Sequence, residues 1–506
     1  MIGTPSVNLK TFIVDPQIAK LVPEETARRY QLIPLFRIKD RLTIAVADPN
    51  NLPAIDEVSR LTGLEIETAV SSVADIQHVL DQVYNTSDSM DDLVKVVDAK
   101  SDEQGTETGV DIREIQRVAE EAPLVRLVNL ILLNAIDAHA SDIHIEPMKD
   151  QVRVRFRVDG VLRETDAFPY RLLLPIVARV KILADLDIIE RRKPQDGRIA
   201  IGVRGRQVDL RVSTFPTHAG EKVVIRILDR SKGLPPLDRI GFPTDVLHQF
   251  QDLIHRPNGV ILVTGPTGSG KTSTLYAALQ EINTPQINII TLEDPVEYQL
   301  PGIAQGQVNA RVGLTFADGL RSILRQDPNV ILVGEIRDGE TARIAIQASL
   351  TGHLVFSTLH TNDAPSTITR LVDLGVESFL ISSSLLGVLA QRLVRCICPD
   401  CREETPADPI LADLLRLPPE LTTATFYKGH GCTACGKTGY RGRIGIFELL
   451  TLPEALRALI VKSASTDELR EAAATLGMRS LRDDGLAKAV AGVTTLAEVL
   501  RVTQET

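Results

Sequence analysis

The sequence predicts a multidomain α/β fold built around a parallel sheet with helices on both faces. Its 506 residues correspond to about three to five domains at roughly 100–200 residues each. Between Gly241 and about Arg395, near-continuous apolar runs alternate with helical stretches, which is the pattern of strands buried on both faces. Residues 151–158 instead alternate between apolar residues and arginines. This alternation predicts a half-buried strand in a separate small α+β domain at 123–230.

The chain before residue 123 contains a small mixed domain and a polar stretch. Residues 42–47 are typical of a buried strand, and a helical pattern follows at 54–61 and ends at Gly63. Residues 86–110 carry seven acids, two lysines and no aromatic ring, which predicts a solvated linker.

The composition argues against non-specific nucleic-acid binding. Lys and Arg number 56 and Asp and Glu number 66, so the net charge is −10, whereas phosphate neutralisation needs clustered positive charge. Aromatic residues make up only 4% of the chain, and Trp is absent, so few side chains are available to stack on the bases of single-stranded nucleic acid.

The sequence shows no signal peptide and no apolar run long enough for a transmembrane helix. We therefore expect a cytoplasmic protein.

Residues 265–272, GPTGSGKT, match the phosphate-binding pattern G-x-x-x-x-G-K-[ST] between a predicted strand at 260–263 and a helical pattern. The glycines let backbone N–H groups converge on phosphate oxygens at a helix N-terminus. Lys271 is expected to reach the β- and γ-phosphates of ATP, and Thr272 to ligate Mg²⁺. The predicted ATP-binding residues are Gly265, Pro266, Thr267, Gly268, Ser269, Gly270, Lys271, Thr272 and Ser273.

Acidic residues follow two further predicted strands. Glu335 follows the strand at 329–333, and the cluster at 293–297 follows the strand at 287–292. Ligands bind at the carboxyl ends of strands in open α/β sheets, and a hydrolase needs carboxylates to position water and to support the metal. We therefore expect these acids, rather than solvated loop acids, at the phosphate site.

Four cationic residues are candidate phosphate sensors. His353 and His360 flank a predicted strand at 354–359, and Arg321 and Arg325 lie four apart on one predicted helix. The alternative for each is a structural or surface residue.

The five cysteines fall between residues 396 and 435. Cys398 and Cys401 form one C-x₂-C pair, and Cys432 and Cys435 form another. Four thiolates make a closed tetrahedral Zn²⁺ site, so this site is predicted to be structural, with Cys396 as a bystander.

The motifs together resemble the boxes of the secretion ATPase superfamily, which includes ATPases of type II secretion and of type IV pilus assembly. The resembling segments are the phosphate loop, LEDPVE (292–297), VGEIRD (333–338), TGHLVFSTLHTNDA (351–364), ASDIHIEP (140–147), FRVDG (156–160), QDGR (195–198), DLRVSTFPTHAGEKVVIRIL (209–228), CPDC, GCTACG and GYRGRIGIFEL.

This resemblance implies a RecA-like P-loop ATPase core, a PAS-like α+β domain, a small N-terminal α/β domain and a zinc-binding, helical C-terminal portion. It implies that Glu335 is the Walker B acid and a Mg²⁺ ligand, and that Glu293 helps to order the attacking water. It also implies that Arg211 and Arg226 deliver positive charge to the nucleotide phosphates. The implied catalytic set is therefore Glu335, Glu293, Lys271, Arg211 and Arg226.

The domains predicted on this basis are six. They are an N-terminal docking domain (1–85), an acidic flexible linker (86–110), a PAS-like domain (111–237), the ATPase core (238–395), a tetracysteine zinc-binding segment (396–445) and a helical C-terminal region (446–506).

The resemblance also implies a homohexamer at the cytoplasmic face of the inner membrane that hydrolyses ATP to assemble a pilus or pseudopilus. Residues 1–85 would dock an inner-membrane adaptor, the zinc-binding part would contact a platform protein, and nucleic acid is not an expected partner. The alternatives are a pilus-retraction motor, a hexameric P-loop motor on nucleic acid and a nucleotide-sensing scaffold without turnover. Some relatives bind cyclic di-GMP through an additional N-terminal segment, but this sequence has no RLG-type motif, so we do not expect that activity.

Overall fold

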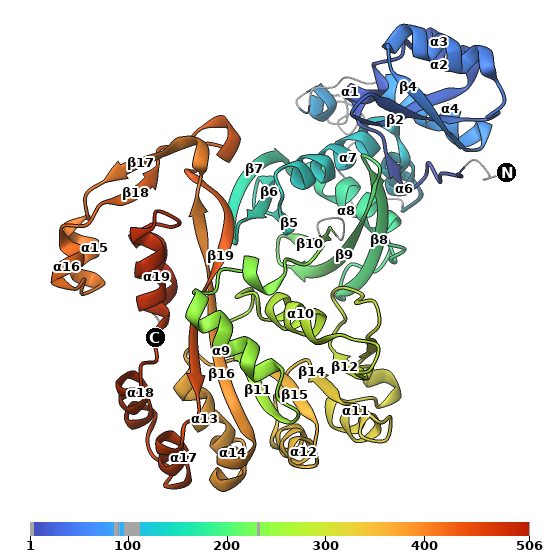
Figure 1. The fold of residues 1–506 in the computed structure, drawn as a ribbon. Coiled ribbons are helices and arrows are strands. Elements are labelled where there is room, and N and C mark those ends of the chain that lie inside the picture. The colour runs from blue at the N-terminus through green and yellow to red at the C-terminus, as the bar shows by residue number, and fades with distance from the viewer. Residues whose placement is uncertain (1–4, 85–89, 91, 96–111, 230–232, 505–506) are drawn as a thin grey trace. The chain divides into compact units, whose positions relative to one another are not determined.

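The computed structural model describes residues 5–84, 90, 92–95, 112–229 and 233–504. The chain forms two compact units, residues 1–233 and 234–506, each with its own sheets and cores (Figure 1). The predicted multidomain α/β class is confirmed. The two units are a coarser division than the six predicted parts, whose boundaries stay predictions. The predicted linker at 86–110 lies almost wholly outside the described residues.

The elements of the first unit occur in this order: β1 (Phe12–Ile13), α1 (Pro16–Ala19), α2 (Glu24–Tyr30), β2 (Leu32–Ile38), β3 (Arg41–Val46), α3 (Leu52–Thr62), β4 (Glu65–Val70), α4 (Val73–Tyr84), α6 (Ile112–Glu120), α7 (Ala122–Asp137), β5 (Asp142–Pro147), β6 (Gln151–Val158), β7 (Val161–Pro169), α8 (Leu173–Leu183), β8 (Gln195–Val203), β9 (Arg206–Thr217) and β10 (Gly220–Leu228).

The first unit contains two sheets. A small sheet of order β2-β3-β4 packs its own core with α1 to α4 and includes the predicted strand at 42–47. A larger, mostly antiparallel sheet has the order β1-β8-β9-β10-β5-β6-β7. On β6, Val152, Val154 and Phe156 are buried against α7 and α8. The alternation at 151–158 therefore predicted both the strand and its buried face.

The elements of the second unit are α9 (Thr244–Ile254), β11 (Gly259–Thr264), α10 (Lys271–Ile282), β12 (Ile289–Glu293), β13 (Ala304–Gln307), α11 (Phe316–Ile323), β14 (Val330–Val333), α12 (Gly339–Leu350), β15 (Leu354–Leu359), α13 (Ala364–Asp373), α14 (Ser378–Ser384), β16 (Leu385–Ile397), β17 (Arg402–Thr405), α15 (Pro409–Leu414), α16 (Pro419–Thr422), β18 (Phe426–Gly429), β19 (Tyr440–Thr451), α17 (Glu454–Val461), α18 (Thr466–Thr475), α19 (Leu481–Val490) and α20 (Leu496–Thr503).

The second unit is built on a sheet of order β13-β12-β14-β15-β11-β16-β19. Every neighbouring pair is parallel except β16 and β19. On β11, Val260 and Leu262 pack in one core with α11 to α14, whereas Ile261 and Val263 pack in another with α9 and α10. Helices thus cover both faces, which explains the continuous apolar runs of these strands.

The structure departs from the prediction at the end of this sheet. Residues 446–451 belong to β19 and not to a helical region, which begins only at α17. The segment is largely buried, pairs with β16 and is covered by α19. Because both faces of the strand are buried, its residues do not alternate between apolar and polar, and the sequence pattern did not predict a strand. β16 and β19 also continue toward the cysteine segment, since Ile397 pairs with Tyr440.

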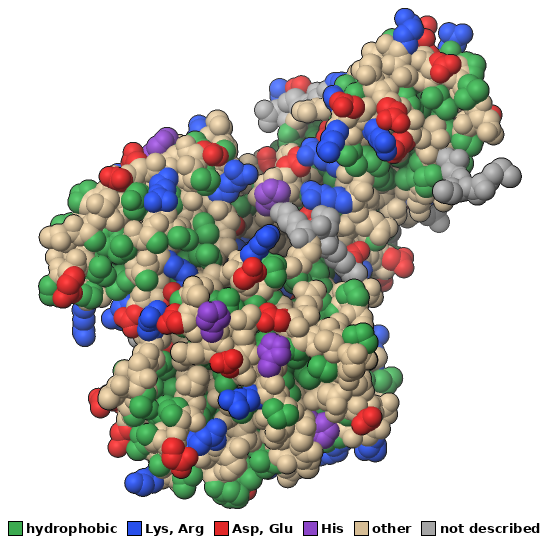
Figure 2. All heavy atoms as spheres, viewed as in Figure 1, with side chains coloured by type: hydrophobic (Ala, Val, Ile, Leu, Met, Phe, Trp, Pro, Cys, Tyr) green, Lys and Arg blue, Asp and Glu red, His purple; other side chains and the backbone are tan. Residues whose placement is uncertain are grey.

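Two further observations concern surface charge and the length of the helices. On the face of the molecule shown in Figure 2, cationic and anionic side chains are intermixed. Among the described residues, no helix has the length and apolar character needed to cross a bilayer.

A buried ion-pair cluster joins the last helix to β16. The carboxylate of Glu498 on α20 pairs with Arg395, at 2.7 Å, and with Arg501, at 2.7 Å, and also accepts the backbone N–H of Arg395. Burial acts to raise the pKa of Glu498, but the bonds from Arg501 and Arg395 outweigh it and lower the pKa to about 2. A depressed pKa adds stability above the ordinary pKa of 4.5, and that stability is lost as the pH falls through about 2.

We expect Glu498→Gln to lower the free energy of unfolding by about 2–4 kcal/mol at neutral pH, because Arg395 is left without its carboxylate. The difference should shrink by about half at pH about 3, as the ordinary carboxyl pKa is passed. Urea denaturation followed by circular dichroism measures both values. Glu420→Gln on α16 is the control, and a loss that does not change with pH would contradict the ion-pair explanation.

Candidate active site and metal centre

The phosphate-binding loop at 265–272 joins β11 to α10, as predicted. Gly265, Gly268 and Gly270 have φ of 146°, 82° and 91°, which side chains rarely adopt. A Cβ on Gly265 would also lie 2.5 Å from the backbone oxygen of Gln391, and one on Gly270 would lie 2.7 Å from Nε2 of Gln391. Only glycine fits this path, which brings the loop to the N-terminus of α10.

Lys271 occupies the first turn of α10. Its Nζ donates to the carbonyl oxygens of Gly265, at 2.7 Å, and Pro266, at 3.1 Å. Burial lowers the pKa of Lys271 to about 8; the Glu335 carboxylate opposes this shift, and the Arg392 charge adds to it. The ammonium group is thus held by neutral carbonyls, and phosphate oxygens would be stronger partners.

Two hydroxyls bear on whether the loop fits a triphosphate with Mg²⁺. Ser269 is buried, and its Oγ has no hydrogen-bond partner among the described residues. Such a buried polar atom is costly unless a ligand satisfies it. Thr272, on the first turn of α10, is exposed, so its hydroxyl is accessible to a metal ion. Backbone amides, Lys271 and these hydroxyls are the donor set that a Mg²⁺–nucleotide requires.

Glu335 lies one residue beyond Gly334, at the carboxyl end of β14. Its carboxylate contacts Arg337 Nη2 at 2.5 Å and His360 Nε2 at 3.4 Å. Burial acts to raise the pKa of Glu335, but Arg337 and His360 outweigh it and lower the pKa. The carboxylate therefore stays ionised at neutral pH, at the same sheet edge as the phosphate loop.

Glu293, at the end of β12, is held in a buried polar cluster. Its carboxylate accepts hydrogen bonds from the hydroxyls of Tyr276 and Thr291 and, at 3.1 Å, from Nε2 of Gln305. Burial raises the pKa of Tyr276, so the phenol remains a donor. In this arrangement both carboxylate oxygens have protein partners, and the predicted role in ordering water stays a prediction.

The four candidate sensors are placed differently. His360 contacts Glu335, whereas His353 precedes the other end of β15 and its Nδ1 lies 2.8 Å from the carbonyl oxygen of Ala348. Arg321 pairs with Asp318 and Glu340, and Arg325 lies 3.4 Å from Ser322 Oγ. Among the described residues, only His360 of these four is paired with a residue of the phosphate site.

Arg211 and Arg226 belong to the first unit. They are directly opposite each other on the antiparallel strands β9 and β10, and Arg226 Nε lies 3.2 Å from Asp142 Oδ1. Arg226 is thus held by a carboxylate of the same sheet, and the role of the two arginines at a nucleotide stays a prediction.

Sequence reasoning missed Gln391 and Arg392 on β16. Gln391 accepts the hydroxyl of Thr274 at 2.7 Å and lies against two glycines of the loop. Arg392 donates to the backbone oxygen of Gln391 at 3.1 Å. Only the parallel pairing of β16 with β11 brings these residues to the loop, because Ala390 is opposite Thr264.

The four predicted zinc ligands form one cluster. The sulfur atoms of Cys398, Cys401, Cys432 and Cys435 all lie within 4.8 Å of one another, with closest separations of 3.7–3.9 Å. Tetrahedral Zn²⁺ with Zn–S distances of about 2.3 Å requires sulfur atoms about 3.8 Å apart. The backbone N–H of Cys432, and then that of Gly439, lowers the pKa of the Cys435 thiol to about 6, whereas burial raises the pKa values of the Cys398 and Cys401 thiols. The spacing of the four sulfur atoms fits Zn²⁺, and Cys396 is not part of the cluster.

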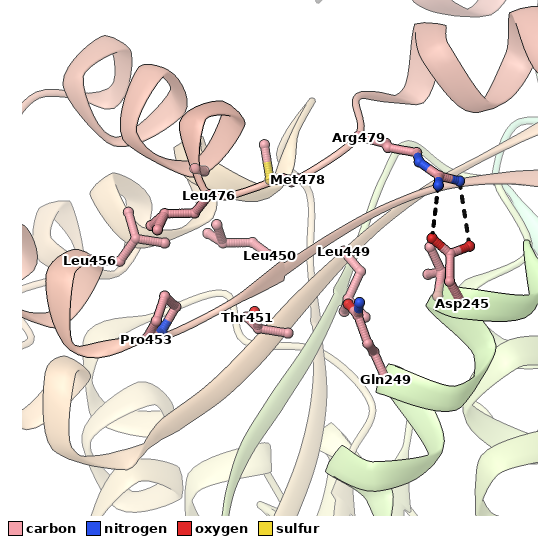
Figure 3. Close-up of a pocket in the computed structure, with 13 residues that line it drawn as sticks. Asp245, Gln249, Leu449, Leu450, Thr451, Pro453, Leu456, Leu476, Met478 and Arg479 are labelled. Atoms are coloured by element: carbon pink, nitrogen blue, oxygen red, sulfur yellow. Dashed lines mark hydrogen bonds and ion pairs between the residues drawn. The ribbon is translucent and has the colours of Figure 1, made fainter.

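A separate pocket of about 200 Å³ lies between α9, β19 and the segment that follows α18 (Figure 3). Leu450, Leu456 and Met478 contribute apolar walls, and Arg479 pairs with Asp245 at 2.9 Å. No residue of the phosphate loop lines it. This pocket is therefore not part of the phosphate site.

Comparison with known proteins gives concordant matches. The sequence model of the family described as type II/IV secretion system protein matches residues 117–501, and that of the MshEN domain matches residues 2–90. The type IV pilus assembly ATPase PilB of Myxococcus xanthus is 47% identical over 504 residues, covering 98% of this chain and 88% of that protein.

The type II secretion system ATPase E of Vibrio cholerae is 47% identical over 497 residues, covering 97% of this chain and 98% of that protein. Among solved structures, that of the pilus retraction motor PilT with bound ADP matches with a TM-score of 0.52 and 29% identity, covering 74% of this chain and 95% of that one.

The depressed pKa of Lys271, about 8, makes a prediction about ATP binding. Because bound phosphates raise this pKa again, binding should take up a proton, and ATP affinity should fall by about 10–30-fold between pH about 7.5 and about 9.5. Isothermal titration calorimetry with Mg²⁺–ATP measures the affinities. Lys271→Arg keeps its charge over this range, so its profile should be flat; equal slopes for both proteins would contradict the assignment.

Cys398→Ser should lower the bound zinc from about one ion per chain and lower the melting temperature, because one missing thiolate opens the tetrahedron. Elemental analysis and thermal denaturation measure the two effects. Cys396→Ser is the matched control and should retain the metal. An unchanged zinc content in the Cys398 variant would count against a four-cysteine site.

Proposed function

Because this chain belongs to the family of type II/IV secretion system proteins, we propose that it is an ATPase motor that drives the assembly of a pilus or pseudopilus. The observation that carries the proposal is the joint placement of the phosphate loop and Glu335. The loop and the acid follow β11 and β14, two parallel strands of one sheet, and the Glu335 charge acts on the pKa of Lys271.

In the proposed reaction, the Lys271 ammonium exchanges the carbonyls of Gly265 and Pro266 for β- and γ-phosphate oxygens. The Thr272 hydroxyl would hold Mg²⁺, which would neutralise phosphate charge when bound. The ionised Glu335 carboxylate, with His360 and Arg337 beside it, orients the attacking water and takes its proton, while the bond between the γ-phosphorus and the β–γ bridging oxygen breaks and ADP leaves. Glu293 supports this edge of the sheet through the Tyr276 cluster.

We further propose that Arg211 and Arg226 bring positive charge to the nucleotide phosphates and so stabilise the transition state. The functional form is a homohexamer, which acts at the cytoplasmic face of the inner membrane through its partners. Residues 1–85 dock an adaptor. The tetracysteine segment (396–445), which Zn²⁺ would stabilise when bound, contacts a platform protein. We assign these roles to the six predicted parts of the chain within the residue ranges given above.

The comparisons favour assembly over the alternatives. The relatives that cover almost the whole chain at 47% identity are an assembly ATPase and a secretion ATPase, whereas the retraction motor shares 29% identity over a smaller share. The net charge of −10 and the mixed surface of Figure 2 disfavour a motor that acts on nucleic acid.

Steady-state phosphate release tests the proposed ATPase activity. Lys271→Ala should abolish turnover, because the transferred phosphoryl group loses its cation, and Glu335→Gln should lower kcat by about 10²–10⁴-fold. Glu403→Gln, an exposed acid on β17 paired with Lys428, is the charge-matched control. Equal and negligible rates for wild type and Glu335→Gln would instead support a scaffold without turnover.

A further inference from the structure

One short segment after β15 connects the phosphate site to four other elements. The segment 360–364 begins with His360, which contacts Glu335, and ends at the first residue of α13. Thr361 is its second residue: its Oγ1 lies 2.6 Å from that of Thr264, which also accepts the Thr361 N–H at 2.9 Å. Thr264 directly precedes the phosphate loop. The segment is therefore hydrogen-bonded beside the loop through Thr361 and contacts Glu335 through His360.

The next residue joins the segment to β16. Arg392 Nη2 donates to the backbone oxygen of Asn362 at 2.8 Å, and Nη1 of the same guanidinium donates to the backbone oxygen of Gln391 at 3.1 Å. Arg392 is buried, so this bridge is shielded from solvent and geometrically defined. The segment is therefore hydrogen-bonded to the strand that lies against the loop.

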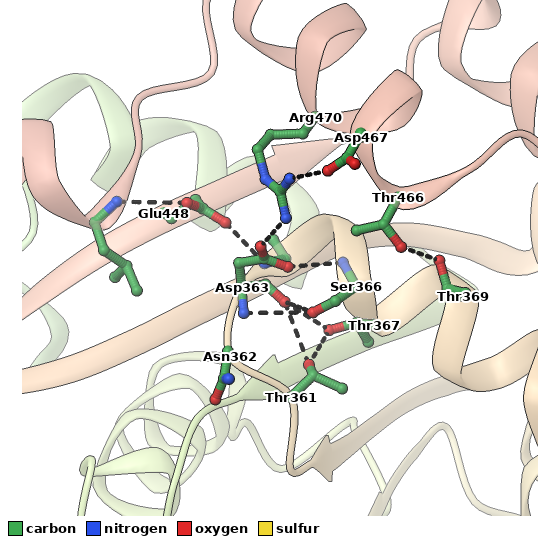
Figure 4. Close-up of polar contacts among 12 residues, drawn as sticks. Thr361, Asn362, Asp363, Ser366, Thr367, Thr369, Glu448, Thr466, Asp467 and Arg470 are labelled. Atoms are coloured by element: carbon green, nitrogen blue, oxygen red, sulfur yellow. Dashed lines mark hydrogen bonds and ion pairs between the residues drawn. The ribbon is translucent and has the colours of Figure 1, made fainter. Parts of the chain in front are cut away.

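Asp363 joins the segment to a helix outside the ATPase motifs (Figure 4). Its Oδ1 accepts the backbone N–H of Ser366 at 2.8 Å and caps α13, while Oδ2 pairs with Arg470 Nη2 of α18 at 2.7 Å. The Asp363 side chain is only 9% exposed. Burial acts to raise the pKa of Asp363, but the bonds from Ser366 and Arg470 outweigh it and lower the pKa.

A second buried acid closes the arrangement. Glu448 of β19 accepts the backbone N–H of Ala364 at 2.7 Å and that of Leu481, the first residue of α19, at 3.4 Å. Burial raises its pKa to about 7, and the nearby Asp363 charge adds to the rise. Two acids thus meet here, and Arg470 is the cation that pairs with Asp363.

We propose that Arg470 of α18 is a positioning residue for ATP hydrolysis, which acts through Asp363 and the segment 360–364 on His360 and Glu335. Arg470 and Glu335 are connected without a break: Arg470 pairs with Asp363, the peptide units of 360–363 follow, and His360 contacts Glu335. Arg470 contacts no nucleotide-binding residue among those described, so its effect is on alignment and not on affinity. This inference rests on the proposed ATPase function.

The consequence is a specific kinetic signature. Loss of Arg470 leaves the buried Asp363 carboxylate beside Glu448 without its cation, and the segment that carries His360 relaxes. Displacement of a catalytic constellation by about 1 Å costs up to about 100-fold in rate. Because the loop amides and Lys271 keep their places, KM for ATP should change by less than about 2-fold while kcat falls by about 10–100-fold.

Steady-state ATPase kinetics of the full chain test the proposal with Arg470→Ala, Arg470→Lys and the control Arg479→Ala. Arg479 also belongs to the C-terminal helical part and pairs with an acid, Asp245 of α9 (Figure 3), but this pair does not touch the segment 360–364. We expect a low kcat with normal KM for Arg470→Ala, substantial recovery for Arg470→Lys and wild-type values for Arg479→Ala.

A double-mutant cycle with Asp363→Asn separates coupling from simple loss of structure. If Arg470 acts through Asp363, the double variant should be no slower than Asp363→Asn alone. Binding of a fluorescent ATP analogue and circular dichroism report on the loop and on folding.

The outcomes are distinct. A wild-type chain without turnover would refute the proposed function itself. With active wild type, an unchanged kcat in Arg470→Ala, or a parallel loss of nucleotide binding and helicity in Arg470→Ala and Arg470→Lys, would overturn the positioning role.

Discussion

Parallel pairing of neighbouring strands is the constraint on which the rest of this protein depends. Thr264 of β11 is opposite Leu359 of β15, and Val333 of β14 is opposite Ser357 of the same strand. Because parallel strands end at one edge, the phosphate loop, His360 and Glu335 meet there although they are far apart in the sequence. Without the pairing of β11, β15 and β14, the phosphate loop, His360 and Glu335 would not lie close enough to form one site.

Backbone geometry then decides what this edge can bind. The loop reaches the N-terminus of α10 only because Gly265 and Gly270 pass against Gln391 without side chains. Lys271 is held by carbonyl oxygens and has a lowered pKa, and Glu335 is held ionised by Arg337 and His360. Lys271 is partly buried and forms no ion pair among the described residues, and it lies near an ionised acid. A polyanion and a water molecule would complete this arrangement.

β16 connects the phosphate site to the cysteine cluster and to α20. It lies beneath the phosphate loop at Gln391 and leads directly to Cys398, the first residue of the cysteine cluster. The same strand is fastened to α20 through Glu498 and to the segment 360–364 through Arg392. The phosphate loop, the cysteine cluster and α20 are therefore all connected through β16.

Features that depend on residue type over a short stretch of chain were predictable from the sequence. The glycines and Lys271 of the loop, the two cysteine pairs, the alternation on β6 and the buried parallel strands were all predictable, because each reflects local backbone demands or a fixed period. Sequence alone also placed Glu335 at the end of a strand. It could not find Gln391, Arg392, Asp363 or Arg470, nor the strand at 446–451, because their roles arise from strand order and helix packing between distant segments. The sequence shows that His353 precedes and His360 follows the strand at 354–359. The contact of His360 with Glu335 became visible only in the fold, because it depends on the direct pairing of β15 with β14.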